Sequence, residues 1–258
     1  MVCLVLIFPF YNLISMVSIR EYSAESNNID TSLLDNLDSI SLNTVKRRID
    51  NLLEAKRVEE EAKKKEEEHL EKYNNTMNAL ANGKTSFRVL FSDTLIVGDS
   101  LMQALAMSDA LDSSNVISMV SASLFHLEEN IGNIVANSPR NLVLHYGINM
   151  LEENEEQMNW YISMYEDLLK EIRKQLPDTK IYISSIFMLL DETKFHRSWI
   201  EKYNNELKKL SEKLNVIYLD NTELLPGDGS YYGTDGIHVQ KTFYTEKWLP
   251  HLYFYLSK

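Results

Sequence analysis

Cysteine and positive charge are both scarce in this sequence. Its 258 residues contain a single cysteine, Cys3, within an apolar run near the N-terminus. The rest of the chain can therefore form neither a disulfide nor a thiolate metal site. Lys and Arg number 26 against 38 Asp and Glu, so the formal net charge is -12. Because the lysines are interleaved with glutamates and no basic face is segregated, we expect no nucleic-acid partner.

Residues 2–19 carry no charge at all. As a helix they would be about 27 Å long, just enough to span the hydrocarbon core of a membrane. Pro9 and Asn12 weaken this interpretation without excluding it. We predict a transmembrane anchor over residues 1–19 that holds the rest of the chain outside the cytoplasm. A cleaved signal peptide and a secreted form are the alternative, although neither a basic n-region nor a small-residue cleavage site is evident.

Residues 20–86 are predicted to be a linker followed by a charged spacer helix. The segment 20–42 is rich in Ser, Asn and Asp, and 45–73 has a helical pattern in which glutamates 59–61 precede lysines 63–65 by four residues. Residues 74–86 are expected to end the helix. Four apolar residues could support a short coiled-coil contact and self-association through this helix, namely Val45, Ile49, Leu52 and Leu53. The apolar stripe stops at Val58, which favours a solvated spacer over a partner-binding helix.

The pattern changes at residue 87, where strand and helix signals begin to alternate. Short apolar runs occupy 94–97, 116–120, 142–144, 181–186 and 216–219, with amphipathic stretches at 101–111, 124–136, 155–175, 197–214 and 240–256. Unbroken apolar strands separated by helices indicate a parallel sheet covered on both faces. We therefore predict that residues 87–258 form a three-layer α/β/α sandwich with a five-stranded parallel sheet.

Ligands bind such sheets at the carboxyl ends of the strands. Three segments lie there, Gly98-Asp99-Ser100, Ser121-Ala122-Ser123 and Gly147-Ile148-Asn149. Ser100 opens a helix, where its free N–H and the helix dipole favour developing negative charge. A helix cap is the simpler interpretation of this serine, whereas a nucleophile needs a base.

Six histidines could supply that base. His69 and His251 lie within helices, and His126 and His196 begin helices, so these four are poor candidates. His145 ends the third strand and is a rival. His238 is favoured because Asp235 precedes it by three residues, within reach of the imidazole Nδ1, which would direct Nε2 toward Ser100. Alone, an Asp-x-x-His sequence is common, and Asp235 and Asn149 could be turn residues.

The combination of GDS, GxN and DxxH resembles the SGNH (GDSL-type) hydrolase family over residues 88–258. This resemblance implies a flavodoxin-like sandwich, a catalytic triad of Ser100, His238 and Asp235, and no metal or cofactor. It also implies an oxyanion hole made by the Ser100 and Ser121 N–H groups and the Asn149 amide, with Gly147 allowing the sharp turn before it.

Two positions differ from the family pattern. Ser121 stands where the family has a glycine, and its N–H can serve only if the local backbone tolerates a side chain. Met150 replaces the aspartate that usually follows the asparagine, which is not one of the catalytic groups.

The predicted function is a membrane-anchored serine esterase that acts on ester groups, O-acetyl ones above all, of cell-envelope carbohydrate or on small esters. An O-acetyltransferase would use the same acyl-enzyme. An inactive domain that binds a glycan or a partner is the third hypothesis, which Ser121 keeps open.

Overall fold

The computed structural model describes residues 42–190 and 195–258. The predicted anchor, residues 1–19, lies outside this part. Within the two described ranges, no helix is both long and apolar enough to cross a membrane. The chain divides into two compact units, Met1–Lys64 and Lys65–Lys258.

The described part of the first unit is the beginning of helix α3, Leu42–Ala81. Arg57 pairs with Glu54 at 2.7 Å and with Glu61 at 3.8 Å, one helical turn away on either side. These side chains are more than half exposed, so each pair adds little stability. Val45, Ile49, Leu52 and Leu53 are 41–66% exposed. The coiled-coil contact therefore stays a prediction.

The second unit is built on a five-stranded parallel sheet with the order β2-β1-β3-β4-β5. Its strands are β1 Thr94–Gly98, β2 Val116–Ser118, β3 Asn141–His145, β4 Lys180–Ser184 and β5 Ile217–Leu219. Each falls on one of the predicted apolar runs. The three central strands are almost fully buried, which is why they lack the alternation of a half-exposed strand.

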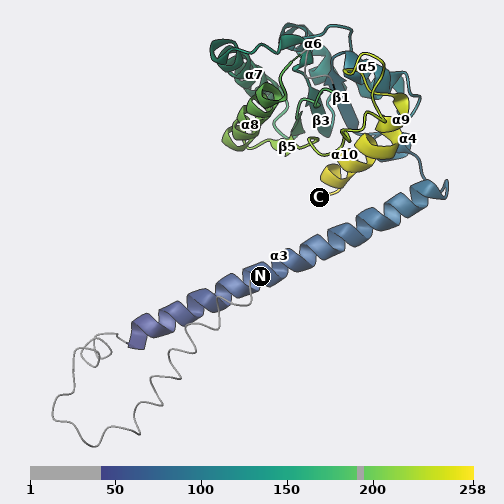
Figure 1. The fold of residues 1–258 in the computed structure, drawn as a ribbon. Coiled ribbons are helices and arrows are strands. Elements are labelled where there is room, and N and C mark those ends of the chain that lie inside the picture. The colour runs from purple at the N-terminus through teal and green to yellow at the C-terminus, as the bar shows by residue number, and fades with distance from the viewer. Residues whose placement is uncertain (1–41, 191–194) are drawn as a thin grey trace, which may run out of the picture. The chain divides into compact units, whose positions relative to one another are not determined.

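Alternate residues of each strand supply two separate cores. Leu95 and Val97 of β1 pack on one face of the sheet, and Ile96 packs on the other. The first face is covered by α6 Leu124–Asn137, α7 Glu155–Gln175 and α8 Arg197–Leu214. The second is covered by α5 Ser100–Ala106 and by the C-terminal segment of α9 Lys241–Phe243, a π-helical turn Tyr244–Trp248 and α10 Leu249–Leu256. Figure 1 shows the resulting three layers, so the predicted fold is confirmed.

Helix α3 runs eight residues beyond its predicted end at residue 73. Its last part belongs to the second unit and packs against α10, where Tyr73 stacks on Tyr253 at 6.4 Å between ring centroids and meets the edge of Phe254 at 5.3 Å. Gly83 then adopts φ +66° and ends the helix, with its own N–H and that of Lys84 bonded back to helix carbonyls. Packing thus carries the helix through an Asn-rich stretch that the sequence alone predicts to end it.

The order of the strands determines where a binding crevice can form on the sheet. The chain leaves β1 toward β2 at one edge and then returns to β3 on the other side of β1, so β1 and β3 flank the point where the order reverses. Crevices form outside the carboxyl ends of strands at such a point. Ser100 directly follows β1, and Asn149 follows β3.

Candidate active site

Ser100 is the first residue of α5 and is held by its two predecessors. Asp99 caps the helix, because its Oδ1 accepts the N–H of Leu101 at 3.0 Å. Gly98 has no room for a side chain, since a Cβ would lie 2.6 Å from the carbonyl oxygen of His145 on the paired strand. The glycine therefore allows β1 and β3 to approach closely just before the serine.

His238 lies in a loop that is folded back on itself. The loop is closed by a bridge between Tyr232 and Val239 and by the N–H of Gly233, which donates to the His238 carbonyl at 2.7 Å. The hydroxyl of buried Tyr232 donates to the carbonyl of Met188 at 2.7 Å and ties the loop to the segment after β4. The chain thus returns His238 to the edge of the sheet where Ser100 lies.

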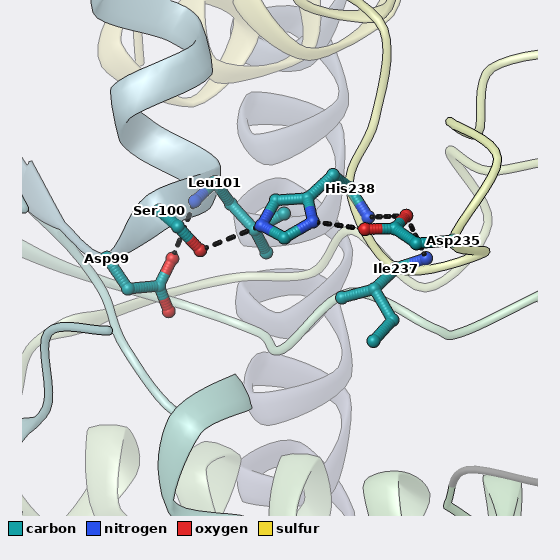
Figure 2. Close-up of polar contacts among 6 residues, drawn as sticks. All are labelled: Asp99, Ser100, Leu101, Asp235, Ile237 and His238. Atoms are coloured by element: carbon teal, nitrogen blue, oxygen red, sulfur yellow. Dashed lines mark hydrogen bonds and ion pairs between the residues drawn. The ribbon is translucent and has the colours of Figure 1, made fainter. Parts of the chain in front are cut away.

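Ser100, His238 and Asp235 form a continuous chain of hydrogen bonds (Figure 2). Ser100 Oγ lies 3.0 Å from His238 Nε2, and His238 Nδ1 lies 2.6 Å from Asp235 Oδ2. The other carboxylate oxygen of Asp235 accepts the N–H groups of Ile237 and His238, each at 3.0 Å. The geometry predicted from the sequence is therefore present, with Nδ1–H directed to the aspartate and Nε2 to the serine.

The pKa of Asp235 is lowered to about 2 by these contacts. Partial burial acts in the opposite direction and would raise it. The hydrogen bond to His238, the two backbone N–H groups and the charge of His238 together outweigh burial. Asp235 is thus ionised near neutral pH and can stabilise a positive charge on His238.

Of the predicted oxyanion residues, Ser100 begins α5, and the others lie in two loops that contact each other. Asn149 Nδ2 donates to the carbonyl of Ala122 at 2.9 Å, which joins the loop after β3 to the loop after β2. A primary amide has two N–H donors, so this bond uses only one of them. Gly147 adopts φ +147°, and a Cβ there would lie 2.5 Å from Ile186. The turn before Asn149 therefore requires glycine.

The backbone conformation of Ser121 shows whether this position, where the family has a glycine, requires a positive φ. It adopts φ +57°, in the left-handed region that glycine enters most easily. The position therefore does demand a positive φ, and a serine occupies it. Its N–H is retained, and its side chain is exposed.

Asp99 is a notable residue of the site that sequence reasoning passed over. It is fully buried, and burial raises its pKa to about 7, although the N–H of Leu101 and the charge of His238 act to lower it. Its position between a buried glycine and the serine, at a strand-to-helix junction, is the sequence signal that could have indicated a helix cap. Its burial depends on packing and leaves no such signal.

The rival base, His145, is a core residue. Its Nδ1 lies 2.7 Å from Ser184 Oγ, its ring packs on Phe187, and complete burial lowers its pKa to about 3. It is therefore a neutral, buried residue and does not act as the base for Ser100. Among the described residues, no cluster of His, Cys, Asp and Glu could hold a metal ion.

A cavity of about 260 Å³ opens beside Ser100. Ser100, Asn149 and His238 line it together with Ile148, Leu151, Leu189, Phe195 and Ile237. Leu189 and Phe195 lie between β4 and α8 in the chain. Tyr231 and Tyr232, which precede His238 in the same loop, are not among these lining residues. Tyr231 instead bonds to Glu246 at 2.9 Å, and Tyr232 is buried.

Comparison with known protein families gives a match within the second unit. The family model of the GDSL-like lipase/acylhydrolase family matches residues 98–245, which is more than half of the chain. The sequence matches none of the curated proteins.

Three solved structures are similar in fold, each with a TM-score of 0.50. One, described as a GDSL-like lipase from Parabacteroides merdae, is 16% identical, and the match covers 64% of this chain and 95% of that one. A GDSL-like lipase from Bacteroides thetaiotaomicron is 12% identical, with 72% and 97% covered. A protein described as an acylhydrolase from Bacteroides fragilis is 12% identical, with 64% and 85% covered. With its sequence match and this fold, the chain belongs to the GDSL-like lipase/acylhydrolase family of ester hydrolases.

Proposed function

We propose that the protein hydrolyses carboxylic esters through an acyl-serine intermediate on Ser100. The observation that carries the proposal is the hydrogen-bond chain from Ser100 Oγ through His238 to Asp235, with distances of 3.0 and 2.6 Å. A serine hydroxyl is a weak nucleophile until an adjacent base takes its proton, and this arrangement supplies that base in the correct tautomer.

In the first half-reaction, Ser100 Oγ attacks the ester carbonyl carbon while His238 Nε2 takes the hydroxyl proton. The carbonyl oxygen becomes an oxyanion, for which the N–H groups of Ser100 and Ser121 and the second N–H of Asn149 are the proposed donors. Asp235 stabilises the imidazolium. The C–O bond to the alcohol then breaks, and His238 returns the proton to the leaving oxygen.

In the second half-reaction, water attacks the acyl-serine and gives its proton to His238. Collapse of the second tetrahedral intermediate releases the carboxylic acid and restores the Ser100 hydroxyl with the proton from His238. Attack by a sugar hydroxyl in place of water would transfer the acyl group instead. The two outcomes share every proposed catalytic residue, so hydrolysis and transfer are separated only by the acceptor.

For the alcohol half of the ester we propose a carbohydrate, as the sequence suggests. The extracytoplasmic location and the cell-envelope substrate depend on residues 1–19, which lie outside the described residues, and they stay predictions. The acetyl group predicted from the sequence stays a prediction as well.

The proposal is tested by labelling the purified chain with a fluorophosphonate, which forms a covalent adduct with an activated serine. We expect one adduct, at Ser100, and none in Ser100→Ala. His238→Ala should lower kcat/KM on p-nitrophenyl esters by about 10²–10⁴-fold, because it removes the general base. Ser92→Ala and His196→Ala are matched controls on exposed residues and should behave as the wild type.

Absence of any adduct in a folded chain, together with absence of ester hydrolysis, would instead favour a domain that only binds a glycan or a partner. Ester consumption that depends on an added sugar acceptor would assign the activity to transfer.

A further inference from the structure

The loop after β2, residues 119–123, carries Ser121, whose N–H is a proposed oxyanion donor. Little apolar burial holds this loop, because Ala122 alone of its residues is buried and Met119 and Val120 are exposed. Ser121 nevertheless adopts a left-handed φ of +57°. A residue with a Cβ keeps such a conformation only where its surroundings fix it. The hydrogen bonds of the loop therefore decide where the Ser121 N–H points.

The loop after β3 holds two of the backbone groups that follow Ser121. Asn149 Nδ2 donates to the carbonyl of Ala122 at 2.9 Å, and the N–H of Leu124 donates to Met150 Sδ at 3.2 Å. A thioether sulfur is a weak acceptor, so the second contact contributes little. Neither contact engages the N–H that lies between these two groups, which belongs to residue 123.

His126 supplies the acceptor for that N–H. Ser123 is the N-cap of α6, and His126 is the third residue of the helix. The N–H of Ser123 donates to His126 Nδ1 at 3.1 Å, and the Ser123 hydroxyl oxygen lies at the same distance from this nitrogen. In a capping box this acceptor usually belongs to Glu or Gln. His126 thus anchors the backbone two residues after Ser121.

The presence of histidine, and not glutamate, affects the charge near the oxyanion. An Nδ1 atom that accepts an N–H carries no proton, so the imidazole of His126 is neutral in this arrangement. A glutamate could close the same capping box, but it would bring a negative charge to the loop that must stabilise an oxyanion. Histidine satisfies the Ser123 N–H without opposing the charge that develops in the transition state.

We propose that His126 is a positioning residue of the oxyanion hole, which keeps the Ser121 N–H directed at the substrate carbonyl oxygen by accepting the N–H of Ser123. The inference rests on the proposed function, because it requires acyl transfer at Ser100. His126 touches no reacting atom and acts only through the loop. The simpler role that the test must exclude is that of a helix cap, which would stabilise α6 and leave catalysis unaffected.

Three substitutions of His126 separate these roles. His126→Leu removes the acceptor and should lower kcat and kcat/KM on p-nitrophenyl acetate equally, by roughly tenfold or more, because the lost interaction acts only in the transition state. His126→Gln keeps an acceptor oxygen and should restore both parameters to within about threefold of the wild type. His126→Glu should resist urea as well as His126→Gln does but have a kcat at least about threefold lower, because its charge opposes the oxyanion.

Asn154→Ala is the matched control for the loss of a helix cap. Asn154 is exposed and caps α7, where its side chain accepts the N–H groups of Glu156 and Gln157 at 2.8 and 3.2 Å. Its substitution should lower the urea midpoint of unfolding, as His126→Leu does, and leave kcat within about twofold of the wild type. All kinetics are measured where urea titration shows the variant to be folded. If His126→Leu does not fold, the comparison of His126→Gln with His126→Glu decides.

A wild-type kcat in His126→Leu, or a loss of the same size in Asn154→Ala, would show that His126 only caps the helix. Equal kcat values for His126→Gln and His126→Glu would likewise contradict the inference. Each of these results leaves the proposed function intact, since the wild type still hydrolyses esters. A wild type that neither hydrolyses esters nor takes the fluorophosphonate label at Ser100 would overturn the proposed function and this inference with it.

Discussion

Ser121 has a conformation that its side chain does not favour. Its φ of +57° is left-handed, where a residue with a Cβ is disfavoured by roughly 1–2 kcal/mol. The backbone N–H of this residue does not depend on the side chain. The serine therefore affects the stability of the loop more than the number of oxyanion donors.

We predict that Ser121→Gly keeps full esterase activity and changes the free energy of unfolding by at most about 1 kcal/mol, because the relief of strain is partly offset by the larger entropy of an unfolded glycine. Ser121→Val should destabilise the chain by more than 1 kcal/mol, since a β-branched residue is especially unfavourable at positive φ. Urea unfolding and kcat/KM on p-nitrophenyl esters measure both effects. A large loss of activity in Ser121→Gly would mean that the serine hydroxyl itself takes part.

The residues of the site differ in how well the sequence predicts them. Ser100, Asn149 and His238 occur in short motifs, each directly after a strand or a turn, and the fold brings them to the same edge of the sheet. The burial of Asp99 is not predictable in this way, because it arises from elements distant in sequence. Tyr244, for example, donates a hydrogen bond from the C-terminal segment to the carbonyl of Leu101, beside Asp99.

At the scale of elements, α3 has two parts with different roles. Before Lys65 its side chains are largely exposed, whereas beyond it His69 and Tyr73 face α10. His69 Nε2 lies 2.9 Å from Ser257 Oγ, and its ring lies 4.6 Å from that of Phe254. The last four turns of α3 thus pack against the C-terminal helix α10.

Tyr73→Ala should therefore destabilise the second unit by about 1–3 kcal/mol, because it removes two aromatic contacts with α10. Leu53→Ala is the control on the same helix, where a side chain that is 62% exposed should change stability by less than about 0.5 kcal/mol. Thermal or urea unfolding followed by near-UV circular dichroism measures both. Equal effects of the two substitutions would contradict a structural role for the last part of α3.

The strands could be predicted because each is a short apolar run between helices, and the near-complete burial of β1, β3 and β4 explains why these three lack the alternation of a half-exposed strand. The end of α3 could not be predicted from the sequence. Asn74, Asn75 and Asn78 have the composition of a linker, and only the contacts of Tyr73 and its neighbours with α10 make helix favourable there. Helix propensity is a weak signal that tertiary packing overrides.

At the scale of the molecule, the fold assembles the site from the two ends of one unit, since Ser100 and His238 are separated by 138 residues. The alternation of strands and helices predicts this meeting, because parallel strands present their carboxyl ends at one edge. The walls of the cavity beside Ser100 could not be predicted in the same way. Leu151, Leu189 and Ile237 come from three loops, and no periodic pattern marks loop residues that converge.

Two buried titratable groups close to this edge respond to pH in opposite directions. The pKa of Asp99 is raised by burial to about 7, so between about pH 4 and 7 the folded chain holds a proton that the unfolded chain has lost. This contribution to stability decreases as the pH rises. The pKa of His145 is lowered by burial to about 3, so between about pH 3 and 6.5 the unfolded chain holds the additional proton. That contribution increases as the pH rises.

The substitution Asp99→Asn should remove the contribution of Asp99 to the pH dependence of the free energy of unfolding and leave that of His145. Asparagine can still accept the Leu101 N–H through its side-chain oxygen, but it does not titrate. The free energy of unfolding of the variant minus that of the wild type should therefore rise by up to roughly 1.4 kcal/mol per pH unit between about pH 4 and 7.

The substitution His145→Gln should have the opposite effect. Its free energy of unfolding minus that of the wild type should fall between about pH 4 and 6.5, since the variant lacks the group whose contribution to stability grows with pH. Urea unfolding at half-unit steps from pH 4 to 8 measures both differences. Parallel curves for Asp99→Asn and the wild type would mean that Asp99 is ionised in the folded chain at pH 5, and that its charge is solvated beside Ser100.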